Sequence, residues 1–270
     1  MAITEFQRTI CQLISESRKK SGASYIAGGV SLNSLIKSPR ISHDIDIFND
    51  SYEALQSGWE NDKVLLVSNK YEIRMLRERP TFIEAIVSKD TENIVLQWTC
   101  DSTFRFFPLV EHEYFGLTLH PVDLATNKTL ALVGRLEVRD WIDMLSSHDK
   151  IQHLGLLAWA ACGKDPGFTS MLILEEAAKS GRYSNAEVCS LIFENYVPNS
   201  SELSQKWKIA LSEARLIIDA LPANEVGKCV LNGNFELLSG NYNEIMCAIG
   251  NGEYSFHEGS IHGAFPVVKE

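Results

Sequence analysis

The stretch Tyr25-Ile-Ala-Gly-Gly-Val-Ser31, followed by Arg40-Ile-Ser-His-Asp-Ile-Asp-Ile-Phe48, decides the fold of this chain. Residues 25–27 are apolar and predict a short strand that ends at the glycine pair. Residues 30–36 predict a helix that turns away from this strand. Acidic and apolar residues alternate over 44–48, which is typical of a half-buried strand. The expected order is therefore strand, glycine pair, helix, loop and second strand.

The two aspartates of this stretch form a candidate metal site. Asp44 and Asp46 are two residues apart, so on a strand both carboxylates project from one face. Ile45 and Ile47, at the alternate positions, then point into the core. Two neighbouring carboxylates repel each other unless a cation neutralises them, and Mg²⁺ prefers such oxygen ligands.

The glycine pair is a candidate phosphate site. Gly28 and Gly29 leave room for backbone N–H groups to approach a phosphate, and the dipole of the helix that follows adds attraction. Ser31 offers a hydroxyl donor in the same turn. Alone, each motif also fits an ordinary turn or an acidic edge strand. In this order they fit a metal–triphosphate, which is the substrate form of phosphoryl and nucleotidyl transfer.

A second block of motifs follows further along the chain. It reads Asp123-Leu-Ala-Thr-Asn-Lys128, then Ala131-Leu-Val-Gly-Arg135, then Arg139-Asp-Trp-Ile-Asp143. The spacing of Lys128, Arg135 and Arg139 gathers positive charge near two helix ends, which suits binding of a nucleotide polyphosphate. Asp140 and Asp143 lie one helical turn apart, and either of them can instead orient one of these cations.

Together the two blocks resemble the nucleotidyltransferase (polymerase-β-like) superfamily and, within it, the AbiEii/AbiGii toxin family of bacterial toxin–antitoxin systems. The resemblance covers residues 20–150. It implies that Gly28, Gly29 and Ser31 hold the triphosphate. It further implies the candidate catalytic residues, which are Asp44 and Asp46 as ligands of two Mg²⁺ ions, Lys128 as a contact to nucleotide phosphates, and Asp143 as the acid of the second block.

One position departs from the pattern that the resemblance implies. Members of the superfamily usually place a third carboxylate on a later strand, where it shares the metal and acts as a base for the attacking hydroxyl. The strand predicted over residues 94–99 offers Gln97 instead. Asp101, just beyond this strand, is the candidate third metal ligand, and Glu84 on the preceding strand is the alternative. If neither reaches the metal, the enzyme relies on two strand acids plus Asp143, or is inactive as a transferase.

The rest of the chain supports an α+β fold, a mixed-sheet domain followed by a helical domain. Thr4 and Gln7 have the capping-box spacing of an opening helix. We expect a catalytic domain over 1–120, a helical domain over 121–221 and an irregular acidic tail of hairpins and loops over 222–270. Further elements are predicted as a helix at 52–59, strands at 64–68, 72–76, 82–87 and 94–99, and helices at 123–133, 137–145, 154–161, 169–178, 186–196 and 201–221.

Composition bounds the function. The chain has 270 residues and a net charge of −10, which excludes a basic coat that binds any nucleic acid but not a local basic region. No apolar run approaches the roughly 18–20 residues needed to span a bilayer, and the first residues do not resemble a signal peptide, so we expect a cytoplasmic protein with no membrane partner. The six cysteines are widely spaced, which argues against a zinc ribbon or a disulfide scaffold.

Three smaller patterns remain open. Arg74, Arg77 and Arg79, with Lys70, form a basic strand that is either a solvated face or a contact for an RNA backbone. The phenylalanines around Arg105 either pack in a core or stack on a base. The histidines have the wrong spacing for a zincin, and none is assigned to a metal.

The sequence therefore favours a Mg²⁺-dependent nucleotidyltransferase that moves NMP from an NTP to an acceptor hydroxyl and releases pyrophosphate. The family resemblance implies a toxin whose acceptor is tRNA and whose partner is an antitoxin protein. Two alternatives stay open. The same donor site could modify a small molecule such as an aminoglycoside, or the chain could be a catalytically silent relative that binds a nucleotide or a protein partner.

Overall fold

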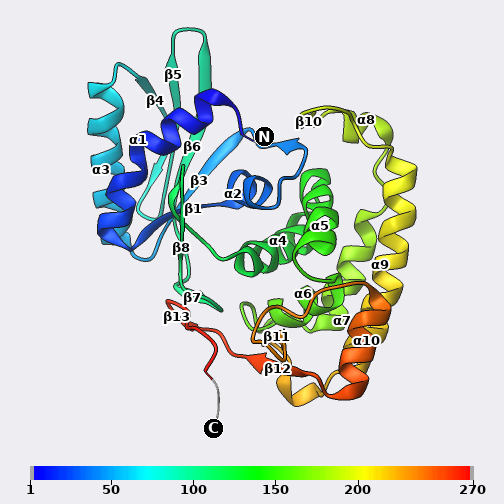
Figure 1. Ribbon diagram of the computed structural model, residues 1–270. Coiled ribbons are helices and arrows are strands. Elements are labelled where there is room, and N and C mark those ends of the chain that lie inside the picture. The colour runs from blue at the N-terminus through cyan, green and yellow to red at the C-terminus, as the bar shows by residue number, and fades with distance from the viewer. Residues whose placement is uncertain (1–2, 268–270) are drawn as a thin grey trace. The chain divides into compact units, whose positions relative to one another are not determined.

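The computed structural model describes residues 3–267, and these divide into two compact units (Figure 1). The first unit contains the residues up to Thr103 together with Leu109–His120. The second contains Phe104–Pro108 and everything from Pro121 onward. The segment expected as a separate acidic tail, from residue 222, belongs to this second unit.

The first unit is built on a seven-stranded mixed sheet with the strand order β4-β5-β6-β3-β1-β9-β8. Strands β3 and β6 are parallel, as are β1 and β9, and the other neighbours are antiparallel. Its helices are α1 (Glu5–Ser21), α2 (Gly28–Leu35) and α3 (Tyr52–Ser68). Its strands are β1 (Ser24–Ala27), β2 (Arg40–Ile41), β3 (Asp44–Asn49), β4 (Glu72–Arg79), β5 (Phe82–Lys89), β6 (Glu92–Cys100), β8 (Val110–His112) and β9 (Gly116–Thr118).

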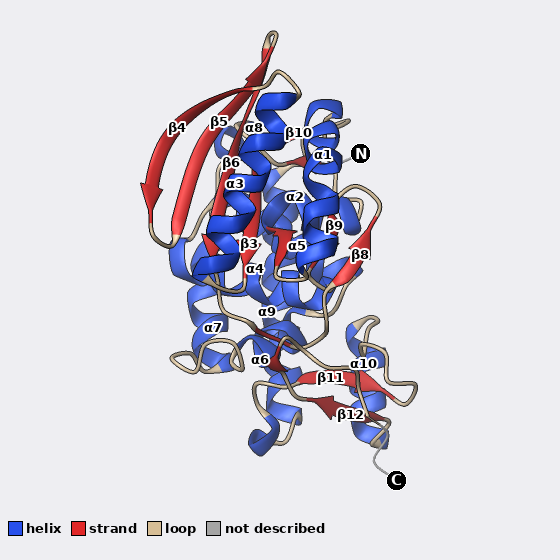
Figure 2. Cartoon of the chain, turned by 90° about the vertical axis from the view of Figure 1, so that its left-hand side faces the viewer, coloured by secondary structure: helices blue, strands red, loops and turns tan. Residues whose placement is uncertain are grey.

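Helices α1 and α3 lie side by side on one face of this sheet (Figures 1 and 2). The predicted capping box of Thr4 and Gln7 starts α1, and Gly22 with a φ of 66° ends it. Beneath these helices the core contains the apolar side chains that alternate along the strands, among them Ile45 and Ile47. The opposite face of the sheet therefore carries the side chains at the other alternate positions of each strand.

A buried ion pair joins the two helices to the sheet. Arg18 of α1 donates to Asp62 of α3 through both terminal nitrogens, at 3.1 and 2.6 Å. The indole of Trp98 on β6 donates to the same carboxylate at 2.8 Å. Both charged side chains are fully buried, and each neutralises the charge of the other. Together with Trp98, the pair fixes the positions of α1 and α3 on the sheet.

The second unit is mainly helical, with α6 at its centre. Every residue of α6 is buried, and it packs against α4, α5, α7 and α9. The elements of this unit are α4 (Pro121–Arg135), α5 (Val138–Lys150), α6 (Leu154–Ala161), α7 (Ser170–Ala177), η1 (Ala178–Ser180), α8 (Asn185–Cys189), α9 (Ser200–Ala220), η2 (Ala223–Glu225), α10 (Tyr242–Asn251), β7 (Phe104–Arg105), β10 (Ile192–Phe193), β11 (Cys229–Asn232), β12 (Tyr254–His257) and β13 (Ser260–Ile261).

The mixed sheet and the helical unit confirm the predicted fold class, and three local predictions are wrong. Residues 64–68 form the last turns of α3, because Trp59, Asp62 and Leu66 are buried at helical spacing. The helix predicted over 186–196 ends at Cys189. The acidic tail contains α10, which Asn241 and Glu244 start with a capping box.

Within residues 3–267 no helix combines the length and the apolar character needed to cross a bilayer. The six cysteines are all free thiols.

The aromatic residues Phe106 and Phe107 are buried in the second unit, as the packing interpretation predicts.

Candidate functional site

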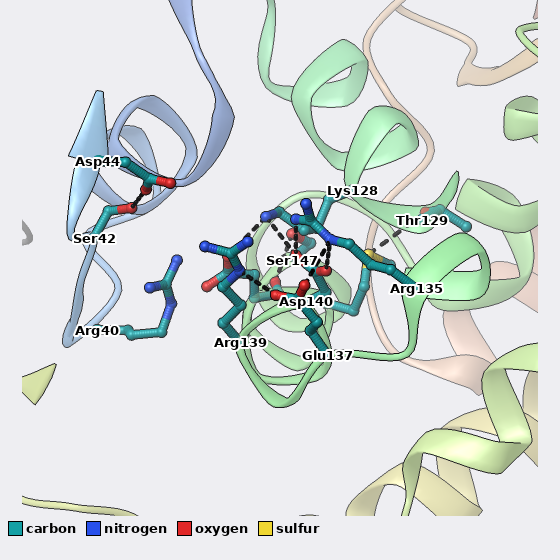
Figure 3. A network of polar contacts seen from close by, with 12 residues as sticks. Arg40, Ser42, Asp44, Lys128, Thr129, Arg135, Glu137, Arg139, Asp140 and Ser147 are labelled. Atoms are coloured by element: carbon teal, nitrogen blue, oxygen red, sulfur yellow. Dashed lines mark hydrogen bonds and ion pairs between the residues drawn. The ribbon is translucent and has the colours of Figure 1, made fainter. Parts of the chain in front are cut away.

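The acidic pair lies on the sheet face that α1 and α3 do not cover. Along β3 the side chains alternate between half-buried and buried, so that Asp44 and Asp46 share one face and Ile45 and Ile47 the other. The hydroxyl of Ser42 donates to Asp44 at 3.0 Å (Figure 3). The predicted arrangement of the two carboxylates is therefore confirmed.

Gly28 places the start of α2 directly against Asp46. Pairing of β1 with β3 sets Ala27 opposite Asp46, so the next residue along the chain lies beside the carboxylate. Gly28 has a φ of +65°, and a Cβ atom added there would lie 1.7 Å from Asp46 Oδ2. Only glycine fits this position, for both reasons. Ala27, the residue before the first turn of α2, makes no side-chain cap hydrogen bond, so the helix start is not capped by its own N-cap residue.

Gly29 faces two polar side chains that sequence reasoning did not assign. A Cβ atom at Gly29 would lie 2.7 Å from Nη2 of Arg40 and 2.9 Å from Oγ of Ser42. Both side chains are largely buried, and Ser42 also contacts Asp44. The signal in the sequence is the pattern Arg40-x-Ser42-x-Asp44-x-Asp46, in which β2 ends at Ile41 and a bend at His43 leads into β3.

Ser31 does not contribute to this surface. Its side chain is fully buried, and its hydroxyl is hydrogen-bonded to Thr118 of β9. Thr118 in turn donates to the carbonyl of Ile26 on β1 at 2.7 Å. Ser31 therefore ties α2 to the sheet, and the prediction that it binds phosphate is not supported by its position.

The strands beside β3 continue a row of polar side chains from Asp46. Asp46 pairs with Gln97 of β6, and Gln97 pairs with Glu84 of β5. The amide of Gln97 donates to Glu84 at 2.9 Å. Gln97 thus occupies the neighbouring-strand position next to Asp46, and Glu84 lies one strand further away.

Asp101 is not brought to this row. It lies four residues beyond Gln97 on a parallel neighbour of β3, which corresponds to about 13 Å along the strand. Its backbone N–H donates to Asn49 at the far end of β3. A residue at that end cannot share an ion with Asp46, so the structure does not support Asp101 as the third metal ligand.

The donor set fits Mg²⁺ held jointly with a substrate. Among the residues that the structure describes, no three His, Cys, Asp or Glu side chains are grouped to hold a metal ion by themselves. Mg²⁺ is commonly held by one or two carboxylates, with substrate phosphates and water completing its shell. Two carboxylates beside an uncapped helix start match that mode, whereas an all-protein cage does not fit.

The second block forms a polar network in the second unit (Figure 3). Lys128 is buried, and its Nζ lies 2.8 Å from Asp140 and 3.1 Å from Asp143. Arg135 donates to both oxygens of Asp140, at 2.6 and 3.0 Å. Burial alone raises the pKa of Asp140, but the hydrogen bonds from Arg135 and the charge of Lys128 outweigh it and lower this pKa to about 2.

The positive charge predicted for this block is neutralised within it. Arg139 Nε lies 2.6 Å from Glu137, which also lies 3.9 Å from Arg135. With Asp140 and Asp143, three acids match the three cations, so the formal charge of the network is zero. Contacts of Lys128, Arg135 and Arg139 with a nucleotide, and a catalytic role of Asp143, therefore stay predictions.

Asp123 is a further buried acid of this unit with a structural role. Its carboxylate accepts hydrogen bonds from the backbone N–H groups of Phe106 and Phe107, at 2.9 and 3.1 Å. Lys164 lies 2.8 Å from the same carboxylate. Asp123 lies in the first turn of α4, and through these contacts it anchors a neighbouring segment.

Comparison with known proteins shows the fold. Neither a protein-family model nor a curated protein sequence matches this chain. The structure is similar to that of MenT4, a nucleotidyltransferase toxin from Mycobacterium tuberculosis H37Rv, with a TM-score of 0.53 and 14% identity over 80% of this chain and 84% of that one. It is also similar to JHP933 from Helicobacter pylori, with a TM-score of 0.51 and 14% identity over 80% and 95% of the two chains. The chain therefore has the fold of a known nucleotidyltransferase, whereas the AbiEii/AbiGii family stays a prediction.

Proposed function

We propose that this chain is a nucleotidyltransferase that transfers NMP from an NTP to an acceptor hydroxyl. The observation that carries the proposal is the contact between Gly28 and Asp46, which sets the uncapped start of a helix against a pair of carboxylates. Helix N-termini bind phosphate, and paired carboxylates bind the cation that accompanies a triphosphate. The similarity of fold to MenT4 supports the same chemistry.

In this proposal the chain's own groups position the triphosphate. The N–H groups at Gly29 and Val30 donate to phosphate oxygens at the start of α2. Arg40, against Gly29, adds a positive charge at the same place. Asp44 and Asp46 would hold Mg²⁺, which when bound neutralises phosphate charge and lowers the pKa of an attacking hydroxyl. Ser42 orients Asp44 through its hydrogen bond.

We further propose a toxin that acts on tRNA and is controlled by an antitoxin protein. The sequence resemblance to the AbiEii/AbiGii family supports this role, and so does the similarity of fold to a protein described as a nucleotidyltransferase toxin. The acceptor and the partner rest on these two likenesses, whereas the transfer chemistry rests on the site itself.

Transfer of label from each α-labelled NTP to total tRNA, in the presence of Mg²⁺, tests the proposal. Asp46→Ala should abolish labelling, because the carboxylate that contacts the helix start is lost. Asp101→Ala is the matched control: it removes an aspartate about 13 Å along the neighbouring strand and should retain transfer. Equal activity of wild type and Asp46→Ala would overturn the assignment of the site. Label on no RNA would redirect the search to small-molecule acceptors.

A further inference from the structure

The edge strand β4 carries three arginines that the proposed active site does not use. Arg74, Arg77 and Arg79 are exposed, and two thirds of the Arg77 side chain is accessible to solvent. Strand β4 is the last strand on its side of the sheet (Figure 2). On a chain with a net charge of −10, three arginines on one strand form a local basic region.

A β-bulge aligns these arginines on one face. Side chains alternate along a strand, so Arg74 would face away from Arg77 and Arg79 if β4 were regular. The pairing of β4 with β5 shifts by one residue between Met75 and Arg77. After the shift, the β5 partners of the three arginines are Ile86, Glu84 and Phe82, which alternate along β5 and share one face.

This face is the one that carries the acidic pair. Glu84, the partner of Arg77, pairs with Gln97, which in turn pairs with Asp46. Arg77 and Asp46 thus end the same row across four strands, about 14 Å apart at the spacing of neighbouring strands. Arg74 ends the row that begins at Asp44. The opposite face is covered by α1 and α3.

The spacing along β4 suits a polyanion in an extended form. Consecutive arginines lie two paired positions apart, which is about 6.6 Å along the strand and comparable to the step between phosphates of an extended polynucleotide. Phe82, half-buried beside Arg79, offers an aromatic ring on the same face. Of the acids nearby, Glu84 lies on the same face, 3.4 Å from the exposed Arg77. Glu78 pairs with Ile83 on the other face, and Glu72 lies at the far end of the strand.

We propose that Arg74, Arg77 and Arg79 bind the phosphate backbone of a single-stranded RNA segment, which is part of the acceptor. Charged residues on an edge strand also prevent pairing with another sheet. That role needs neither a single sign of charge nor a shared face, so it does not explain the bulge. The identity of the RNA as acceptor rests on the proposed function, but the binding itself does not.

Binding of a fluorescein-labelled oligouridylate, followed by fluorescence anisotropy over a range of salt concentrations, tests this face without any NTP. The combined variant Arg74→Gln, Arg77→Gln, Arg79→Gln should bind roughly tenfold or more weakly. The slope of log affinity against log salt should become shallower by about 2. The matched control, Lys19→Gln, Lys20→Gln, Lys63→Gln, removes the same charge from α1 and α3 and should bind like wild type.

The outcomes separate this inference from the proposed function. In transfer assays, loss of the arginines should raise the apparent KM for RNA far more than it lowers kcat. Unchanged RNA binding in the arginine variant, or an equal loss in the lysine control, would overturn the inference even if transfer is observed. Binding that depends on the arginines, without transfer to any RNA, would support this face and overturn only the acceptor assignment. The charge-conserving variant with three lysines should retain most of the binding, and loss of binding there would contradict a backbone contact.

Discussion

Two polar centres of this molecule, one in each unit, look alike in the sequence and differ in the structure. In the first unit, Asp44 and Asp46 are half-buried and lie beside a glycine backbone. In the second, Asp140 and Asp143 are fully buried and bonded to Lys128. The first pair is half-buried and faces the start of a helix, whereas the second is held in buried ion pairs with Lys128.

The comparison teaches that charged motif residues have to be judged by their partners. The pair Arg18 and Asp62 in the first unit resembles the second centre, because both of its charges are buried and bonded to each other. Removing one partner of such a pair strongly destabilises the protein. The intact pair nevertheless adds little stability compared with apolar residues of similar size in its place. A site for a charged ligand differs, because its groups have to stay accessible to that ligand, as the half-buried Asp44 and Asp46 are.

Breaking the second centre should give the largest effect on stability. Asp140→Ala takes one carboxylate from the buried Lys128 and removes the acceptor of two Arg135 hydrogen bonds, so we expect a loss of about 3–5 kcal/mol in the free energy of unfolding. Urea unfolding at neutral pH measures it. Asp46→Ala, the matched control from the first centre, should change this free energy by less than about 1 kcal/mol. A stable Asp140→Ala protein without transfer activity would instead place Asp140 in the active site.

Filling the glycine contact should damage the first centre. A methyl group at Gly28 meets Asp46 Oδ2 and also disfavours the φ of +65°, so Gly28→Ala must displace the carboxylate. We expect transfer to fall by about 100-fold, the typical cost of an ångström of misplacement. Gly134→Ala is the control, since an added Cβ atom meets nothing within 4 Å there. If Gly28→Ala keeps wild-type transfer, the backbone at this position does not contact the triphosphate.

Acid should act on the second unit through two buried histidines. Burial lowers the pKa of His153 to about 4, and burial together with the charge of His153 lowers that of His148 to about 4. Both values lie below the ordinary 6.5, so the folded state holds these histidines neutral. Their contribution to the free energy of unfolding is fully present above pH 6.5 and is lost as pH falls from 6.5 toward 4. In this pH range each histidine should lower the free energy of unfolding by up to about 1.4 kcal/mol per pH unit.

Urea unfolding between pH 7.5 and 4.5 measures this loss. His153→Gln should make the dependence on pH shallower by the share of one histidine, because glutamine does not titrate. The ring of His153 accepts from the Gly155 N–H through Nδ1, so Nε2 carries the proton and faces Glu213. If the free energy of unfolding depends on pH identically in wild type and variant, His153 does not contribute to the sensitivity to acid.

Much of the fold was predictable from local pattern, and the reasons are visible in particular elements. The capping box of Thr4 and Gln7, the strand at 44–49 and the fully apolar helix 154–161 all follow from short-range signals that tertiary packing reinforces. The strand expected at 64–68 failed because a short apolar run fits a strand or a helix equally well, and burial decided it. Helix α10 was missed because its capping box lies in a glycine-rich segment.

The candidate site was predictable only where the backbone itself places the residues. The spacing of Asp44 and Asp46 fixes their common face, and a glycine pair after a strand fixes the start of α2. Sequence could not show that Ser31 bonds to Thr118, or that Lys128 has two acidic partners, since these contacts join distant parts of the chain. Register was equally hidden: Gln97 lies on β6 and Asp101 just beyond its end, and only the pairing with β3 shows which of them lies beside Asp46.

The row across the sheet offers the finest test of the first centre. Gln97→Glu would place a third carboxylate between Asp46 and Glu84, where like charges on neighbouring strands repel. We expect a loss of about 1 kcal/mol, or roughly 3 °C in Tm, at neutral pH without Mg²⁺. Arg77, 3.4 Å from Glu84, keeps this loss small.

Adding Mg²⁺ should restore the stability of Gln97→Glu, because a cation held at Asp46 offsets the added charge. Gln97→Ala is the control: it removes the same hydrogen bond to Glu84 without adding a carboxylate, and its Tm should respond to Mg²⁺ as wild type does. A larger rise in Tm for the glutamate variant than for the alanine variant would show that the row gathers a cation. Equal rises would mean that the carboxylates of this face do not share one, and the difference between the two centres would then be one of burial alone.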